Sequence, residues 1–111
     1  RKKKFSLLEK NEEIGYLTYE YPGDASGKRN VNFLYLYIKP SHRRMGLAIK
    51  LLKYALKVFK HATWISFWTG KEAEIAKSYP LYRGIGFKQI AYQADYYKKG
   101  TGTRLFVKRM S

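Results

Sequence analysis

Two arginines and two small residues stand close together in the segment His-Arg-Arg-Met-Gly-Leu-Ala, residues 42–48. The segment lies where a strand-like run gives way to a helix-like one. A helix begins with backbone N–H groups that lack partners inside the helix, and its dipole adds partial positive charge there. Gly46 lets a ligand approach the backbone, and Arg43 and Arg44 can donate charge-assisted hydrogen bonds. The pattern predicts an anion-binding site, with phosphate as the natural ligand.

The same residues have a plainer interpretation, in which Ser41 caps the helix, Gly46 fills an ordinary place in its first turn, and the arginines are solvated. Neither of the two common phosphate signatures, G-x-x-x-x-G-K-[ST] and G-x-G-x-x-G, is present. The choice between the two interpretations therefore depends on the surrounding elements.

The amino-acid composition excludes several classes of protein. A chain of 111 residues with 45% hydrophobic and 17% aromatic residues fits one folded domain, residues 1–111, and is unlike a disordered protein. The absence of cysteine excludes disulfides and thiolate sites, and only two histidines, His42 and His61, argue against a bound metal. No apolar run reaches the roughly 20 residues that span a bilayer. We expect a soluble, cytoplasmic protein.

The net charge of +15, from 23 Lys and Arg against 8 Asp and Glu, favours anionic partners. Nucleic acid, a phosphorylated cofactor and an acidic protein all satisfy that requirement.

Hydrophobic periodicity predicts the secondary structure. Apolar or alternating runs predict six strands, at residues 5–8, 14–21, 31–38, 63–69, 87–97 and 103–110. Helical spacing predicts a long helix over residues 44–60 and a short one over 72–79 that Pro80 ends or kinks. The apolar face of the long helix comprises Ala48, Leu51, Leu52, Ala55, Val58 and Phe59.

The order of these elements predicts a mixed α+β fold. The strand 31–38 is apolar on both faces and should be central, and the helix after it should lead to a parallel neighbour, the strand 63–69. The strands 5–8 and 14–21 are predicted to form one antiparallel hairpin, and the strands 87–97 and 103–110 another. We therefore expect a mixed, mostly antiparallel sheet flanked by helices.

Two motifs carry a resemblance to a known family. Residues 43–48 (RRMGLA) satisfy [QR]-x-x-G-x-[GA], the acyl-CoA-binding motif of the GNAT acetyltransferase superfamily, in the context YLYIKPSHRRMGLAIKLL. A second segment, LYRGIGF at residues 81–87, is similar to the LY-x-x-x-GF ending of the family's next helix. The two matches occur in the family's order, and the resemblance runs over residues 7–110.

The resemblance implies an acyltransferase that uses acetyl-CoA as cosubstrate and needs no metal. In the family, an amine attacks the thioester directly, and a backbone N–H on the strand 31–38 would polarise its carbonyl. The strands 31–38 and 63–69 would splay apart around the pantetheine arm, which would pair with the backbone of Leu36 and Ile38. The pyrophosphate would lie on the amides of Arg43, Arg44, Met45, Gly46, Leu47 and Ala48.

Tyr82 matches the family tyrosine that protonates the departing thiolate. A phenol of pKa about 10 is protonated at neutral pH, so the role is chemically sound. The alternative is that Tyr82 packs its ring in the core like other tyrosines. Because Pro80 interrupts the family's helix, Tyr79 is a second candidate for the acid.

The general base is left open. No carboxylate stands on the strand 31–38, where some members have glutamate, so the candidates are ordered water or one of Glu20, Glu72 and Asp95. Ile75 stands where many members have a coenzyme-contacting asparagine. His42, expected to be exposed, and His61, just past the helix, are given no catalytic role.

The chain opens at what resembles the family's second strand, so the first strand and the first helices are expected to be reduced or absent. A minimal family member, a homodimer partner or an upstream segment could each account for the missing wall of the acceptor site. For the acceptor we expect a neutral amine, or one carried by an acidic partner, because a +15 protein repels polycations. The alternative function is a non-catalytic basic module of the same fold that binds nucleic acid or an acidic partner.

Overall fold

A six-stranded sheet forms the frame of the protein, which is described by a computed structural model covering Arg1–Ser111. The strand order is β1-β2-β3-β4-β6-β5, and β3 lies in the interior of the sheet as its two apolar faces predict. Only β3 and β4 run parallel, and every other pair is antiparallel. The strands are β1 (Lys3–Glu9), β2 (Glu12–Glu20), β3 (Asn30–Ile38), β4 (Trp64–Trp68), β5 (Lys88–Lys98) and β6 (Thr101–Arg109).

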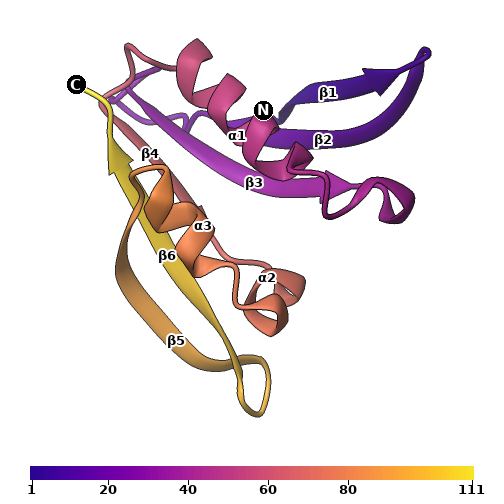
Figure 1. Cartoon of the computed structure of the whole chain (residues 1–111). Helices are drawn as coiled ribbons and strands as arrows, with labels where there is room; N and C mark the ends of the chain where they lie inside the picture. Colours follow the sequence, from indigo (N-terminus) through magenta and orange to yellow (C-terminus); the bar gives the residue numbers. More distant parts are fainter.

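One hydrophobic core joins the two halves of the sheet to the helices. The long helix α1 (Leu47–Val58) contributes Leu51, Leu52 and Ala55 to this core, while Ile65 of β4 and Phe106 of β6 are fully buried in it. Burial of the leucine, isoleucine and phenylalanine side chains among these contributes about 1.5–3 kcal/mol each. Figure 1 shows α1 lying along β3, whereas the short helices lie beside β4 and β6 on the other arm of a V-shaped molecule.

The mixed, mostly antiparallel α+β fold is confirmed, and each predicted strand is present with its ends displaced by no more than two residues. The long helix is shorter than the prediction of residues 44–60, because Arg44 and Gly46 adopt left-handed φ angles of 65° and 73° that a helix cannot contain. Val58 was assigned to the apolar face but is 45% exposed, which corrects that part of the pattern.

The segment after β4 differs most from the prediction of one helix over residues 72–79. It forms two short helices, α2 (Lys71–Ala76) and α3 (Tyr79–Gly84), separated by Lys77 in the left-handed conformation. Pro80 lies in the first turn of α3, where its missing N–H has no helical partner to lose. The proline therefore begins a helix instead of ending one, and Tyr82 is helical.

A single turn of 3-10 helix, η1 (Pro40–His42), connects β3 to the residues before α1. None of the helices is long and apolar enough to cross a membrane.

Candidate functional site

The two parallel strands separate soon after they meet. β3 and β4 pair over only three positions, ending at Asn32 and Ser66, and the rest of each strand diverges. In the same region β3 contains a bulge, because Thr18 faces Tyr35 while Tyr19 faces Phe33, which leaves Leu34 as the extra residue. The divergence opens the V seen in Figure 1 between β3 and the arm that carries α2 and α3.

A cavity of about 540 Å³ occupies this opening. Its walls come from β3, the end of β4, the start of α1 and both short helices, and most of the lining residues are hydrophobic. The volume falls within the range of about 300–1,000 Å³ typical of small-molecule sites. A ligand with a sizeable apolar portion would fit such a lining.

The edge of β3 that faces the cavity carries backbone hydrogen-bonding groups. The N–H of Lys39 donates to the carbonyl of Ile14 on β2 at 2.7 Å. Because the polar groups of successive strand residues point to opposite sides, those of Ile38 and Leu36 point away from β2 and toward the cavity. The predicted pairing edge is therefore present, although the Ile38 carbonyl already accepts a hydrogen bond of 2.8 Å from Nε of Arg43.

The residues before and at the start of α1 form a cradle of unpaired backbone amides, which we define as residues 44–49. None of these amides donates a hydrogen bond within the chain, and no side chain caps the helix. Two left-handed residues, Arg44 and Gly46, alternate with residues of ordinary conformation. Such alternation curves successive N–H groups around a common point and makes an anion-binding concavity.

Gly46 is exposed, and a Cβ placed on it would meet no atom within 4 Å. The space in front of the cradle is therefore open, and the glycine is required by its φ of 73° and not by packing. Ser41 does not cap α1; its hydroxyl lies 2.8 Å from Nδ1 of His42 instead. A diphosphate fits this arrangement, because the amides and the helix dipole both favour negative charge.

Arg43 is held beside the cradle. Besides its bond to Ile38, its guanidinium lies 5.8 Å from the ring centre of Tyr37. The backbone amide of Arg43 already donates to the carbonyl of Pro40 at 3.4 Å, so it is not among the unpaired amides. Arg43 can therefore bind an anion through its side chain. The unpaired backbone amides begin at Arg44.

The structure brings most of the predicted coenzyme-binding residues to the cavity. Those that line it are Leu36, Ile38, Arg43, Arg44, Gly46, Leu47 and Ala48. Met45 does not line it, and its side chain points into solvent with 62% of the residue exposed.

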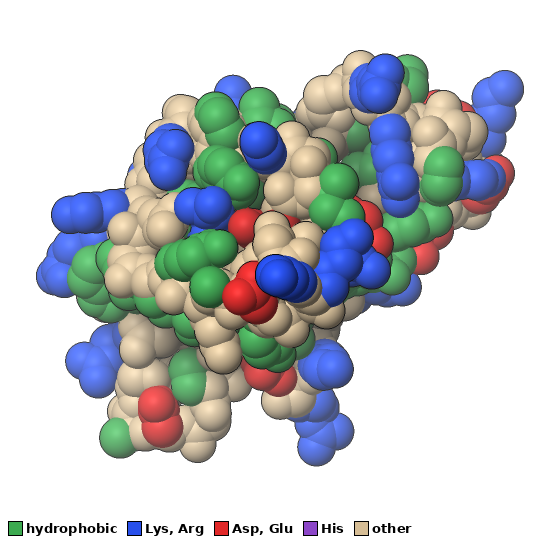
Figure 2. Space-filling model, turned by 90° about the horizontal axis from the view of Figure 1, so that it is seen from below, with side chains coloured by type: hydrophobic (Ala, Val, Ile, Leu, Met, Phe, Trp, Pro, Cys, Tyr) green, Lys and Arg blue, Asp and Glu red, His purple; other side chains and the backbone are tan.

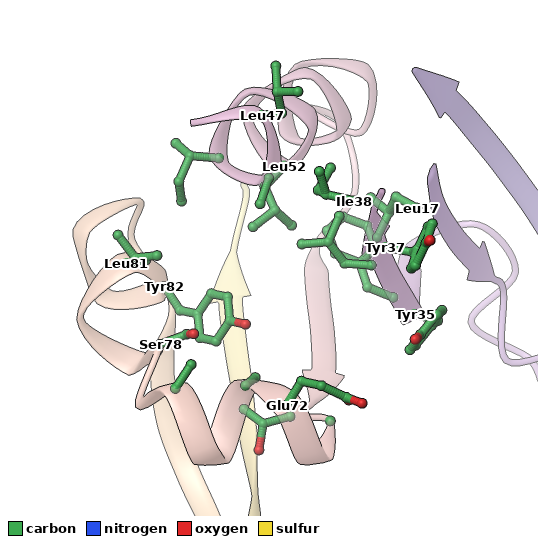
Figure 3. A pocket seen from close by; sticks show the side chains of 18 of the residues that line it. Leu17, Tyr35, Tyr37, Ile38, Leu47, Leu52, Glu72, Ser78, Leu81 and Tyr82 are labelled. Atoms are coloured by element: carbon green, nitrogen blue, oxygen red, sulfur yellow. The ribbon is translucent and has the colours of Figure 1, made fainter. Parts of the chain in front are cut away.

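Tyr82 projects from α3 into the cavity, opposite side chains of β3 such as Ile38 (Figure 3). Its ring packs edge-on against Phe67 of β4 at 4.9 Å and against Phe106 at 5.4 Å. Burial raises the pKa of Tyr82 above its usual value, the negative charge of Glu74 raises it further, and the nearby Ser78 hydroxyl opposes the shift. The hydroxyl therefore keeps its proton throughout the neutral range and is a hydrogen-bond donor. The ring of Tyr82 packs on the core, and the same side chain also lines the cavity.

Tyr79 takes a different place. It does not line the cavity, and its ring lies 3.9 Å from the guanidinium carbon of Arg104. Of the two candidate acids, only Tyr82 reaches the site.

Of the three candidate carboxylates, too, only one reaches the cavity. Glu72, in the first turn of α2, lines the cavity and makes no ion pair or hydrogen bond. Its side chain extends from α2 toward the side of the cavity formed by β3 (Figure 3). Glu20 lies outside the cavity at the end of β2, and Asp95 accepts a hydrogen bond from the amide of Gly100 in the β5–β6 hairpin. Ile75 is also outside the cavity and 58% exposed.

The histidines take no part in the reacting region of the cavity. His42 is half-buried, contrary to the prediction that it is exposed, because its Nε2 lies 3.0 Å from a carboxylate oxygen of Glu9. It lines the cavity at the cradle end. His61 lies at the far end of α1, where it borders a separate hollow.

Sequence reasoning did not assign several residues that line the cavity, among them Trp68, Thr69 and Ser78. Trp68 and Thr69 fell inside a predicted strand, but nothing in their types indicated the direction of their side chains. Ser78 lies between the two short helices, a junction that the predicted single helix did not contain.

Comparison with known proteins decides the family. Residues 2–89 match the family model described as "Acetyltransferase (GNAT) domain", which is most of the chain. The chain belongs to the GNAT acetyltransferase family. The resemblance of its two motifs is thereby confirmed. A search of curated protein sequences finds no match.

Solved structures of acetyltransferases share the fold. The ribosomal-protein-S18-alanine N-acetyltransferase of Escherichia coli superposes with a TM-score of 0.84 at 16% identity, covering 100% of this chain and 70% of that one. An acetyltransferase from Bacillus cereus gives 0.79 at 17% identity, covering 98% and 73%. An aminoglycoside 6'-N-acetyltransferase complexed with coenzyme A gives 0.75 at 13% identity, covering 99% and 73%. At these identities the likeness establishes the fold alone.

Proposed function

We propose that this GNAT protein transfers an acetyl group from acetyl-CoA to an amine. The observation that carries the proposal is the run of unpaired amides at residues 44–49, which opens at the end of a cavity between two splayed strands. The left-handed backbone at Arg44 and Gly46 supports the proposal, because its alternation with ordinary residues turns these amides toward a common point where an anion can bind.

The cradle and Arg43 would hold the diphosphate of the cosubstrate. The backbone of Leu36 and Ile38 would pair with its pantetheine arm, with the Ile38 carbonyl shared with Arg43. A backbone N–H of β3 would donate to the thioester carbonyl, and the bulge at Leu34 supplies an unpaired stretch of strand where this is feasible. Acetyl-CoA supplies the activated acyl group, and the chain supplies position and hydrogen bonds.

Tyr82 would donate to the departing thiolate. Because its pKa is raised above the usual 10, while a thiol has a pKa of about 8.5, complete proton transfer is uphill. The role of Tyr82 is therefore to stabilise the thiolate with a hydrogen bond, and solvent completes its protonation.

Glu72 would remove the proton from the attacking amine, directly or through one water molecule. It is the one acidic side chain that lines the cavity, and no cation of the chain neutralises it. The acceptor would be a neutral amine or an amine on an acidic partner, since the chain's own charge of +15 opposes the approach of a polycation.

An assay of thiol release from acetyl-CoA with a panel of amines tests the proposal. We expect turnover with neutral amines or with amines on acidic peptides. Preferential turnover of spermine would refute the preference for such acceptors, and no thiol release above the hydrolysis rate with any amine would refute the transferase itself.

The net charge supports a second candidate, a non-catalytic module that binds nucleic acid. Figure 2 shows Lys and Arg side chains spread over one whole face of the molecule, with acidic side chains among them, and not gathered into one stripe. Charge alone would give binding that depends steeply on salt and little on sequence. Titration with duplex DNA over a range of salt tests this candidate, and submicromolar binding at physiological salt together with no affinity for acetyl-CoA would favour it.

A further inference from the structure

Arg104, on β6, touches four other residues on three elements. Its Nε donates to the carboxylate of Glu74 on α2 at 3.2 Å, and one terminal nitrogen donates to Gln89 of β5 at 3.1 Å. The guanidinium carbon lies 3.9 Å from the ring centre of Tyr79 on α3 and 4.9 Å from that of Tyr92 on β5. The side chain is 22% exposed, so these contacts are largely shielded from water.

Thr69, the residue after β4, connects Glu74 to the backbone of Arg104 and so joins these contacts into a network. The hydroxyl of Thr69 donates to the second oxygen of Glu74 at 2.7 Å and accepts from the backbone N–H of Arg104 at 2.9 Å. Its carbonyl accepts from the hydroxyls of Tyr97 and Thr103. Glu74 is 7% exposed, and both of its oxygens are bonded. We define this network as Arg104, Glu74 and Thr69 with the rings of Tyr79 and Tyr92.

The network is adjacent to the part of the cavity wall that contains Tyr82. Thr69 itself lines that cavity, and Tyr79 stands three residues before Tyr82 on the same six-residue helix. Glu74 is close enough for its charge to raise the pKa of Tyr82. So short a helix has little stability of its own and takes its position from such tertiary contacts.

We propose that Arg104 is a positioning residue, which holds α2 and α3 against β6 so that the hydroxyl of Tyr82 points into the cavity. The proposal rests on the acetyltransferase function inferred above. It assigns no contact between Arg104 and either substrate, because Arg104 does not line the cavity. The cradle for the diphosphate lies on the other arm of the V and does not depend on Arg104.

A double-mutant cycle between Arg104 and Tyr82 tests the proposal. Tyr82→Phe should lower kcat by about 10²-fold, the lower end of what one hydrogen-bond donor to a developing anion contributes. Arg104→Met should lower kcat by about 10- to 100-fold through misplacement of Tyr82, with the affinity for acetyl-CoA changed by less than about twofold. In the Y82F background, the same change at Arg104 should alter kcat by less than about twofold.

Two further variants separate positioning from stability. Loss of Arg104 leaves the buried Glu74 unpaired and lowers thermal stability, so Arg104→Met is also made together with Glu74→Gln, which removes the unpaired charge and should restore the melting temperature but not kcat. Arg109→Met is the matched control, because Arg109 lies on the same strand with its cation 5.3 Å from the ring of Trp64, and it should leave kcat unchanged.

The outcomes distinguish a failure of the positioning role from a failure of the function. Equal loss of kcat from Arg104→Met in the parent and Y82F backgrounds, in an active enzyme, would overturn the positioning role. If the parent chain neither binds acetyl-CoA nor releases thiol, the function fails, and the position of Tyr82 is then read by NMR from its ring resonance, assigned with Y82F. That resonance should move in Arg104→Met and not in Arg109→Met. An unmoved resonance contradicts the proposal.

Discussion

The requirement for glycine at position 46 gives the sharpest prediction. Gly46 has a φ of 73°, and a Cβ added to it would meet no atom within 4 Å, so Gly46→Ala introduces backbone strain and no clash. A left-handed alanine costs about 1–2 kcal/mol. For a chain of this length, that cost corresponds to a fall in melting temperature of about 4–9 °C, using about 2.1 cal/mol/K per residue for the entropy of unfolding.

The chain can relieve this backbone strain by a change of conformation that disrupts the cradle. Helical spacing continues back to Arg44 in the sequence, so an alanine at position 46 favours extension of α1 through the residues that now form the cradle. Such an extension would take amides away from the ligand. Loss of one charge-assisted hydrogen bond of about 1.5–3 kcal/mol weakens binding by roughly 10- to 150-fold. We therefore expect Gly46→Ala to weaken acetyl-CoA binding by at least tenfold in calorimetry.

Gly100→Ala is the matched control for this experiment. Gly100 has a φ of 83° and equally open surroundings, but it lies in the β5–β6 turn, away from the cavity. It should lose similar stability and keep the parent affinity for acetyl-CoA. If Gly46→Ala and Gly100→Ala bind acetyl-CoA equally well, the reasoning about the cradle is wrong.

Three other predictions concern single side chains. Tyr82→Phe should lower kcat by about 10²-fold without weakening acetyl-CoA binding, whereas Tyr79→Phe should lower kcat less, and equal losses in steady-state kinetics would contradict the assignment of Tyr82 as the hydrogen-bond donor to the thiolate. Glu72→Gln should lower kcat by about 10²-fold without weakening acetyl-CoA binding, and an unchanged kcat would leave water as the base. Lys39, through its hydrogen bond and charge, lowers the pKa of Glu12, so this pair contributes stability above the unfolded pKa of about 4.3 that is lost as the pH falls through the folded value. Denaturant unfolding between pH 2 and 6 should show a slightly shallower loss of stability in Glu12→Gln, and an identical pH dependence would contradict the pairing.

Strand pattern and motif order were sufficient to predict the fold and its family. Alternating or continuous apolar runs are long and distinct in this sequence, and the one parallel pair follows from a helix between two strands. The ends of the helices and strands were harder to predict from the sequence, because they depend on the backbone conformation of individual residues. Arg44 adopts a left-handed φ although its type favours a helix, and the pattern that predicted helix from residue 44 contains no sign of it.

The wall of the site around α2 and α3 was the least predictable part. Pro80 is compatible with the end of one helix or with the first turn of the next, and the side chain alone does not decide between them. The ion pair between Glu74 and Arg104 joins residues 30 positions apart, and no local pattern announces it. Tyr82 was identifiable only through its family motif, since the chain has eleven tyrosines.

Calorimetric titration of the unmodified chain with coenzyme A and with pantetheine tests the central claim most directly. The two ligands share the arm that would lie along β3, and only coenzyme A carries the diphosphate that would lie on the amides of residues 44–49. We predict that coenzyme A binds at tens of micromolar or tighter and that pantetheine binds at least tenfold more weakly. Equal affinity for the two, or no heat from coenzyme A, would contradict the account.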